Sequence, residues 1–341
     1  MTSDITERLG QFIGSQTHVD DVQVSDYDAI GGGYLHVTAR FTALIDGVMK
    51  TLVSRSEPSA ERTVMAADLE LEWTLLRHLT DLGAAFAAPA LWFDADGTVM
   101  GTRTLVSEFV EGQTVAELWA TASTADRRRV TELMVDAAAS ISKVDVTALP
   151  ADVVRPRSWE AYVDSMIAHW RHTEAQMAER DPFLRYVAAW LEVNKPPPVP
   201  FTLVHGDFQA TNLVMTDAGV VAIDWEVAHV GDIREDIAWL QMVDGFRAEP
   251  IYRGNEEEIL AAFRERTGFE KDVINQRTVA YFSMICVLRM GAGVFEQMAA
   301  MHRGENKSIA VAYSGCVISQ VHDDWYRIIQ KLDGVDQGSP G

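Results

Sequence analysis

Three side chains in one segment of the chain are of the types that handle phosphate and metal ions. The segment reads LVHGDFQATNLVMTDAGVVAIDWEVAHVGDIREDIAWL, and its polar residues stand at the ends of apolar runs, where they tend to face a cleft. The runs NLVM and VVAID flank the turn-forming TDAG, which predicts a hairpin with Met215 near Val220. Counting outward, Asn212 and Asp224 meet at the same end of this hairpin, and Asp207 reaches the same space from the preceding loop.

These residue types match the needs of phosphoryl transfer. An amide oxygen and a carboxylate are hard ligands of the kind that Mg²⁺ takes, together with phosphate oxygens and water. The reaction also needs a carboxylate that orients the attacking hydroxyl and accepts its proton. Taken singly, each residue is more often part of a capped turn, but the spacing of Asp207, Asn212 and Asp224 favours a catalytic site.

Histidines offer a competing interpretation. A metallohydrolase would use His205, Asp207 and Asp224 as ligands, but such sites normally need additional histidines. His169 and His172 lie three apart on an expected helix, with no third ligand nearby, and are interpreted as an exposed face. His229 follows the candidate site closely in sequence, and its role stays open.

Composition narrows the class of partner. The 341 residues carry 29 basic and 50 acidic side chains, a formal charge of −21 that would repel a nucleic acid backbone. The same field would attract a cationic small molecule, although a solvated acidic surface is the more ordinary explanation. No nucleic acid partner is expected.

The cysteines and the N-terminal residues indicate a cytoplasmic protein. Cys286 and Cys316 stand alone, without the spacing of a zinc site or a disulfide framework. The start MTSDITERLG has neither a basic nor an apolar signal region, and the apolar stretch YFSMICVLRMGAGVF is interrupted by Arg289. We expect neither secretion nor a membrane span.

The elements that must position these residues change character along the chain. Strand-like runs rich in Val, Thr, Tyr and Phe alternate with turns early on, followed by one helix and a further strand. The expected strands are residues 22–30, 34–45, 48–55 and 102–110, and the expected helix is 60–82. An α+β sheet region with one helix is the resulting prediction.

Beyond Gly112 the pattern is mostly helical. SWEAYVDSMIAHW places apolar residues at the spacing of a buried stripe, and NKPPPVP stiffens the chain before the candidate site. Helices resume over 236–330. Because single cores rarely grow beyond about 250 to 300 residues, we expect two lobes, an N-lobe at 1–112 and a C-lobe at 113–341.

The motifs HGDFQATN, IDWE and GDIREDIAWL resemble those of the aminoglycoside phosphotransferase and choline kinase family of protein-kinase-like enzymes. The resemblance implies a two-lobed kinase-like fold and transfer of the γ-phosphate of ATP or GTP. It makes Asp207 the catalytic base and Asn212 and Asp224 the Mg²⁺ ligands. His205 becomes the residue that shapes the catalytic loop, and Glu226 braces the metal site or faces the substrate.

The resemblance also covers the nucleotide site. LVSEFVEG resembles the family's hinge, so backbone groups of Ser107, Glu108 and Phe109 would meet the adenine edge. TLVSR resembles the strand with the phosphate-gripping cation, here Arg55. In LEWTLLRHL, Glu72 shares a helix face with leucines, which requires a cation as partner, and Arg55 is the expected one.

Two features depart from the family pattern. Arg55 replaces the lysine that is usual in the antibiotic kinases. The glycine loop reads Gly32, Gly33, Tyr34, Leu35 and His36, without the hydroxyl and amide that often follow the glycines. Phosphate contact from Gly32 and Gly33 would therefore come from backbone N–H groups.

The acceptor is not specified by these motifs. The resemblance implies a hydroxylated small molecule, by default an aminoglycoside and alternatively choline, a sugar or an amino-alcohol. Asp244 and Glu256 to Glu258 could attract a polyamine, although NEEE is more often a solvated helix start. A nucleotide-binding protein without catalytic activity is the remaining alternative.

Overall fold

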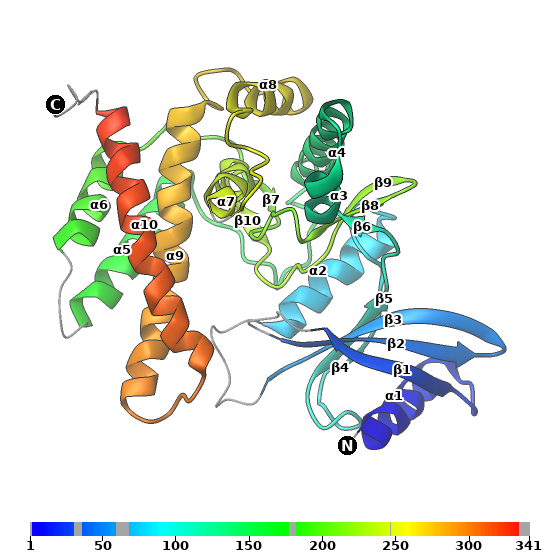
Figure 1. Cartoon of the computed structure of the whole chain (residues 1–341). Helices are drawn as coiled ribbons and strands as arrows, with labels where there is room; N and C mark the ends of the chain where they lie inside the picture. Colours follow the sequence, from blue (N-terminus) through cyan, green and yellow to red (C-terminus); the bar gives the residue numbers. More distant parts are fainter. Residues whose placement is uncertain (1, 31–35, 59–67, 177–181, 246, 334–341) are drawn as a thin grey trace.

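The computed structural model describes residues 2–30, 36–58, 68–176, 182–245 and 247–333, which form a sheet-rich N-lobe and a helical C-lobe (Figure 1). The N-lobe holds an antiparallel sheet of order β1-β2-β3-β5-β4. Its strands are β1 (Gln23–Ile30), β2 (Val37–Ile45), β3 (Val48–Ser56), β4 (Ala90–Asp94) and β5 (Thr104–Glu108). The predicted strands are confirmed, whereas β4 was not predicted.

The central strands are joined by a tight hairpin. Asp46 and Gly47 have φ of 50° and 76°, and Ile45 pairs with Val48 across this two-residue loop. Asp-Gly is the sequence that such a left-handed turn favours. The turn fixes the register of β3 and thereby the placement of Arg55 near the far end of that strand.

Two helices cover opposite faces of the sheet, where the sequence predicted one helix. In β5, Leu105 joins the core cluster of α2 (Leu69–Asp81), while Val106 joins that of α1 (Thr2–Thr17). The prediction missed α1, although Leu9, Phe12 and Ile13 have helical spacing and are buried. The helix predicted over 60–82 is confirmed at 69–81, and residues 59–67 lie outside the described residues.

The start of α2 explains how a charged residue enters the core. Asp68 caps the helix and accepts hydrogen bonds from the backbone N–H groups of Glu70 and Leu71 at 3.0 and 3.3 Å. Glu72 then lies on the buried face with Leu76 and Leu79, as the sequence predicted. The cap therefore sets the rotation that turns the Glu72 carboxylate inward.

The C-lobe surrounds two small sheets with helices. The sheets are β6-β8-β9 and β10-β7, from β6 (Gln113–Thr114), β7 (Thr202–Val204), β8 (Leu213–Thr216), β9 (Gly219–Ala222) and β10 (His229–Gly231). The helices are α3 (Val115–Thr121), α4 (Thr124–Ser142), α5 (Trp159–Gln176), α6 (Pro182–Val193), α7 (Arg234–Asp244), α8 (Glu256–Thr267), α9 (Gln276–His302) and α10 (Ile309–Leu332). The predicted two-lobed α+β class is confirmed, and the predicted boundary after Gly112 stays a prediction.

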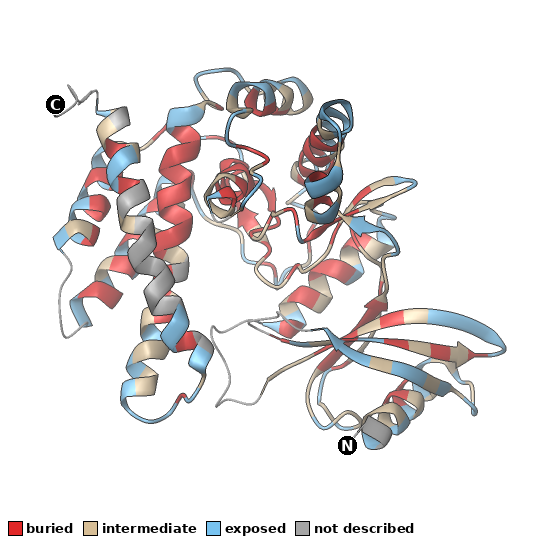
Figure 2. Cartoon of the chain, viewed as in Figure 1, coloured by how far each residue is buried: buried red, intermediate tan, exposed pale blue. Residues whose placement is uncertain are grey.

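Helices α7 and α9 form the centre of the C-lobe core, and Figure 2 shows buried residues along both helices. In length and composition α9 could cross a membrane, but 82% of its most apolar window is buried within the lobe, as in a core helix. The core also reaches the N-lobe. The backbone N–H of Ala222 donates to Phe86 O at 2.8 Å, and the rings of Phe86 and Trp225 lie 6.1 Å apart.

Candidate active site

The hairpin of β8 and β9 is confirmed as predicted. Met215 pairs with Val220, and the backbone N–H of Ile223 donates to Asn212 O at 2.8 Å beyond the last strand pair. Asn212 and Asp224 therefore lie together at the open end. Asp224 has φ of 69°, a left-handed conformation that costs a residue with a side chain about 1 to 3 kcal/mol and is concentrated at functional sites.

The loop that carries Asp207 is fixed through its backbone. Asp236 of α7 accepts hydrogen bonds from the N–H groups of His205 and Gly206, both at 2.9 Å. Gly206 has φ of 81°, and a Cβ there would lie 2.5 Å from Val227 O. Only glycine fits this close approach. The carboxylate of Asp236 and the backbone carbonyl of Val227 thus fix the conformation of this loop.

His205 acts on the backbone of this loop. Its Nε2 lies 3.0 Å from Ile223 O, and its Nδ1 accepts the N–H of Asp207 at 3.3 Å. Burial lowers the pKa of His205 to about 4, so the ring is neutral, with Nε2 as the donor. Both ring nitrogens are engaged. This geometry supports the loop-shaping role and leaves no nitrogen for the metal that the hydrolase alternative requires.

Asp207 is surrounded by three N–H donors. Gln209 Nε2 donates to its two oxygens at 2.8 and 3.1 Å, Asn212 Nδ2 donates at 2.6 Å, and the indole of Trp239 donates to Oδ1. Burial and the nearby charge of Asp224 raise the pKa of Asp207 to about 7, although the three donors oppose the shift. A carboxylate with this pKa is suited to accept a proton near neutral pH.

Opposite the loop lies a cluster of buried charges. Arg55 donates to both Glu72 and Asp224, which confirms the predicted pair with Glu72 and adds a partner that was not predicted. Glu226 Oε2 lies 3.7 Å from Arg55 Nη2 and 2.9 Å from His36 Nδ1. Glu226 thus contacts Arg55 and His36, and its role toward the metal or the substrate stays a prediction.

The charges of this cluster fit a bound cation. Three carboxylates share one guanidinium and one imidazole, and burial raises the pKa of Glu72 against the opposing charge of Arg55. The Asp224 side chain is 25% exposed, and Asn212 lies at the same end of the hairpin. Carboxylate and amide oxygens suit Mg²⁺ when phosphate oxygens and water complete its shell. Within the described ranges, no group of three His, Cys, Asp or Glu side chains could hold a metal without such additional ligands.

Several backbone groups of the predicted hinge already form hydrogen bonds within the protein. Ser107 is paired on both sides within the sheet, and the N–H groups of Glu108 and Phe109 donate to Pro89 O and Thr51 O. An adenine at this edge would have to use other backbone groups of the segment. Its contact with Ser107 to Phe109 stays a prediction, and the glycine-loop residues Gly32 and Gly33 lie outside the described residues.

Sequence reasoning missed four side chains of the site. Gln209 and Trp239 bind Asp207, His36 binds Glu226, and Asp236 holds the catalytic loop. Trp239 follows Asp236 by three residues on a helix, so the two share a face. That spacing is the signal that could have placed Trp239 beside the loop, whereas nothing local marks His36, whose partner is 190 residues away.

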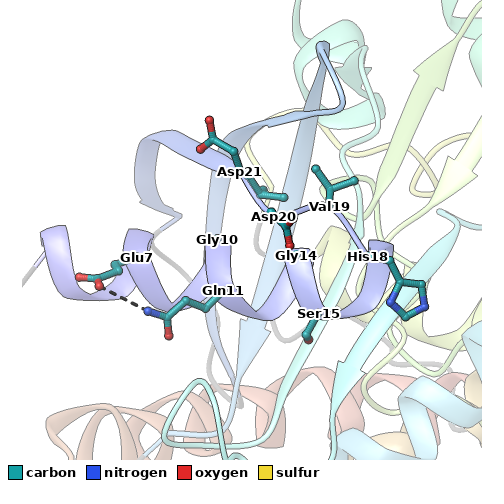
Figure 3. A pocket seen from close by; sticks show the side chains of 10 residues that line it. Glu7, Gly10, Gln11, Gly14, Ser15, His18, Val19, Asp20 and Asp21 are labelled. Atoms are coloured by element: carbon teal, nitrogen blue, oxygen red, sulfur yellow. Dashed lines mark hydrogen bonds between the residues drawn. The ribbon is translucent and has the colours of Figure 1, made fainter.

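A cavity of about 610 Å³ lies elsewhere, between α1 and the segment that leads into β1 (Figure 3). Its lining includes Glu7, Gln11, His18, Asp20 and Asp21. Because α1 covers the sheet face opposite α2, this cavity is separated from Arg55 by the sheet. It is not part of the candidate site.

The architecture matches solved kinase structures. A candidate aminoglycoside phosphotransferase of Ralstonia eutropha aligns with a TM-score of 0.69 and 18% identity over 96% of this chain and 98% of that one. A GDP complex of aminoglycoside 2'-phosphotransferase-IIIa gives 0.63 and 15% over 94% and 99%. A choline/ethanolamine kinase family protein of Mesorhizobium loti gives 0.57 and 15% over 89% and 91%. These likenesses establish the fold.

Curated proteins match over part of their length. Acyl-CoA dehydrogenase family member 10 of Mus musculus is 25% identical over 247 residues, which are 71% of this chain and 22% of the mouse protein. A probable acyl-CoA dehydrogenase of Arabidopsis thaliana, IBR3, is 26% identical over 239 residues, 66% of this chain and 28% of that protein. The chain thus spans about a quarter of these relatives. The sequence model of the phosphotransferase enzyme family matches residues 29–272, and the chain therefore belongs to that family.

Proposed function

We propose that this protein transfers the γ-phosphoryl group of ATP or GTP to a hydroxyl of a small molecule. The observation that carries the proposal is the convergence of Asp207, Asn212 and Asp224 at one end of a hairpin, in contact with the Arg55–Glu72 pair. These are the parts that phosphoryl transfer requires: a base, metal ligands and a phosphate-binding cation.

In the proposed reaction Asp207 orients the acceptor hydroxyl and takes its proton. The hydroxyl oxygen forms a bond to the γ-phosphorus, the bond from that phosphorus to the bridging oxygen breaks, and the nucleoside diphosphate leaves with the electron pair. Mg²⁺ held by Asn212 and Asp224 would neutralise phosphate charge. Arg55, oriented by Glu72, would bind the phosphates from the N-lobe side.

The acceptor implied by the resemblance is an aminoglycoside, with a choline-, sugar- or amino-alcohol-like metabolite as the alternative. Similar solved structures include one with hygromycin B and one with kanamycin, which supports a hydroxylated small molecule as the class. The cytoplasmic location expected from the sequence stays a prediction.

The test is ADP release from Mg-ATP in the presence of aminoglycosides, macrolides, choline and simple hydroxylated metabolites. We expect turnover with one acceptor class, lost in Asp207→Ala and kept in Asp217→Ala, which changes an exposed aspartate in the hairpin turn. Silence with every acceptor while calorimetry shows nucleotide binding would favour the non-catalytic alternative. Turnover that survives in Asp207→Ala would refute the assignment of the base.

A further inference from the structure

A second cavity, of about 330 Å³, lies between α5, the loop before it and β10. Its walls are partly apolar, and two of its side chains are basic. The lining residues are Val154, Pro156, Arg157, Ala161, Tyr162, Ser165, His229 and Val230. None of these lining residues is acidic, although acidic side chains outnumber basic ones by 50 to 29 in this chain.

The cavity borders the catalytic loop. His229 pairs with Val204, which directly precedes His205, and Val227 O touches the backbone of Gly206. The segment that follows Asp224 therefore passes the loop, and β10 then forms one wall of the cavity. A molecule seated there would contact β10, the strand that pairs with the strand leading into the catalytic loop.

Glu235, a buried carboxylate in contact with the lining residues Tyr162 and His229, is already neutralised by the protein. Glu235 accepts hydrogen bonds from Tyr162 Oη at 2.6 Å and from Arg289 at 3.2 Å, and Arg289 also lies 2.9 Å from His229 Nε2. Burial alone would raise the pKa of Glu235, but His229 and Arg289 lower it to about 2. Glu235 is thus a buried anion held by Arg289 and by hydrogen-bond donors, and it offers no free charge to a ligand.

Arg157 is a charged side chain at the cavity, and it has no ion-pair partner among the described residues. Its side chain is exposed, and it makes no hydrogen bond or ion pair with any residue that the structure describes. The next arginine in the chain to the N-terminal side, Arg155, donates to the carbonyls of Val146 and Val153 and is fully committed to the loop. An anion in the cavity would therefore meet a free guanidinium.

Three of the four acidic residues that could attract a polyamine have partners within the protein. Asp244 is buried and accepts the backbone N–H of Ile251 at 3.0 Å. Glu257 pairs with Arg264 at 2.7 Å. Glu258 pairs with Arg128 of α4 at 3.0 Å, so this part of α8 faces α4. These three carboxylates therefore already have partners, and polyamine binding in this region stays a prediction.

We propose that the cavity binds the anionic group of the acceptor, so that the substrate is a hydroxylated molecule with a carboxylate or phosphate and not a polycation. The inference rests on the proposed kinase function and specifies its substrate class. Arg157 would bind the anion, and Val154, Pro156 and Val230 would contact the carbon skeleton. It departs from the aminoglycoside and choline classes, whose members carry positive charge.

The test uses four acceptors that share one carbon chain and differ in charge: glycerate, glycerol 3-phosphate, glycerol and 3-amino-1,2-propanediol. We expect kcat/KM for ADP release to be at least about tenfold higher for one of the anions than for the neutral or cationic compound. The better anion distinguishes carboxylate from phosphate recognition. A preference for the cation would overturn the proposal.

Substitutions test whether the preference for anionic acceptors depends on this cavity. Arg157→Glu and Ala161→Glu, which each place a carboxylate at the cavity, should lower kcat/KM for the anion about tenfold and change glycerol turnover less than twofold. Arg129→Glu is the matched control, because Arg129 is exposed on α4 and has no ion pair or hydrogen bond among the described residues. Equal losses in Arg157→Glu and Arg129→Glu would refute a specific site.

Binding separates this inference from the kinase assignment. If no compound supports ADP release, saturation-transfer NMR of the same four compounds with Mg-AMP-PNP decides. Anion binding that is lost in Arg157→Glu would sustain the site while the proposed reaction fails. Absence of any Arg157-dependent anion binding would overturn the site.

Discussion

The two halves of the candidate site hold their carboxylates by different means. On the C-lobe side Asp207 is surrounded by the neutral donors of Gln209, Asn212 and Trp239. On the side that faces the N-lobe, the full charge of Arg55 holds Glu72 of α2 and Asp224 of the C-lobe. The neutral donors orient Asp207 while it keeps its basicity. The ion pairs of Arg55 hold carboxylates in place, and these carboxylates and Arg55 can then interact with a bound cation and with phosphates.

The difference has a chemical meaning. Neutral hydrogen bonds only partly offset burial, so the pKa of Asp207 stays raised at about 7, as a base near neutral pH requires. A charged partner in the same position would hold the pKa low and make a poor base. The arginine is therefore expected on the metal and phosphate side of the site, as found.

The largest stability effect should come from Arg55→Met. Removal of the guanidinium leaves Glu72 buried without its cation, and we expect the free energy of unfolding to fall by about 3 to 5 kcal/mol. The control is Arg77→Met, because Arg77 pairs with Asp81 on the exposed side of the same helix, where a loss of at most about 1 kcal/mol is expected. Urea unfolding measures both, and similar losses would remove the contrast between the two halves.

On the C-lobe side, Gly206→Ala should cost about 3 kcal/mol and reduce turnover, because the added Cβ meets Val227 O. Gly268→Ala isolates the backbone contribution, since Gly268 has φ of 76° and open space around it, and should cost about 1 kcal/mol. Thermal and urea unfolding provide the comparison. Equal losses of stability in the two variants would mean that the close approach of Gly206 to Val227 O contributes nothing.

The pH dependence of kcat/KM should follow Asp207. Because the base must be ionised, activity should rise with pH and level off above an apparent pKa near 7. The raised folded-state pKa also means that the stability contributed by protonated Asp207 is lost between about pH 4 and pH 7. Asp207→Asn should accordingly gain stability relative to the wild type as the pH rises through that window, and the opposite trend would contradict the assignment.

The smallest effect concerns Trp239→Phe, which removes one N–H donor from Asp207. A hydrogen bond to a charged group contributes about 1.5 kcal/mol or more, so the apparent pKa of the activity profile should rise by about one unit. Trp190→Phe removes an indole bond to Asp333 far from the loop and should leave the profile unchanged. A lower activity with an unshifted pKa would assign Trp239 a purely structural role.

The elements close in sequence could be predicted, because local patterns determine them. The TDAG turn and the apolar runs beside it gave the hairpin and the meeting of Asn212 with Asp224. The buried face of α2 required a cation for Glu72, and strand alternation placed Arg55 on the correct face. Helix α1 was missed because its apolar stripe is narrow and stands among polar residues.

The contacts that join distant segments could not be predicted. The pairing of His36 with Glu226 and of Trp239 with Asp207 depends on how the lobes and helices pack, which no local spacing reports. The use of the Glu108 N–H group by Pro89 follows from the loop that enters β4, an element that the sequence pattern did not reveal. The acidic run on α8 was interpreted from composition, and its ion pairs depend on packing against α4.

The most direct test compares Asp207→Ala with Asp224→Ala in two assays, calorimetric binding of Mg-ATP and acceptor-dependent ADP release. We expect Asp207→Ala to lose about 10²- to 10⁴-fold in turnover while its nucleotide affinity stays near that of the wild type. Asp224→Ala should lose both turnover and metal-dependent nucleotide binding. Full activity in both variants, or an equal loss of nucleotide binding in both, would contradict the division of roles between the two aspartates.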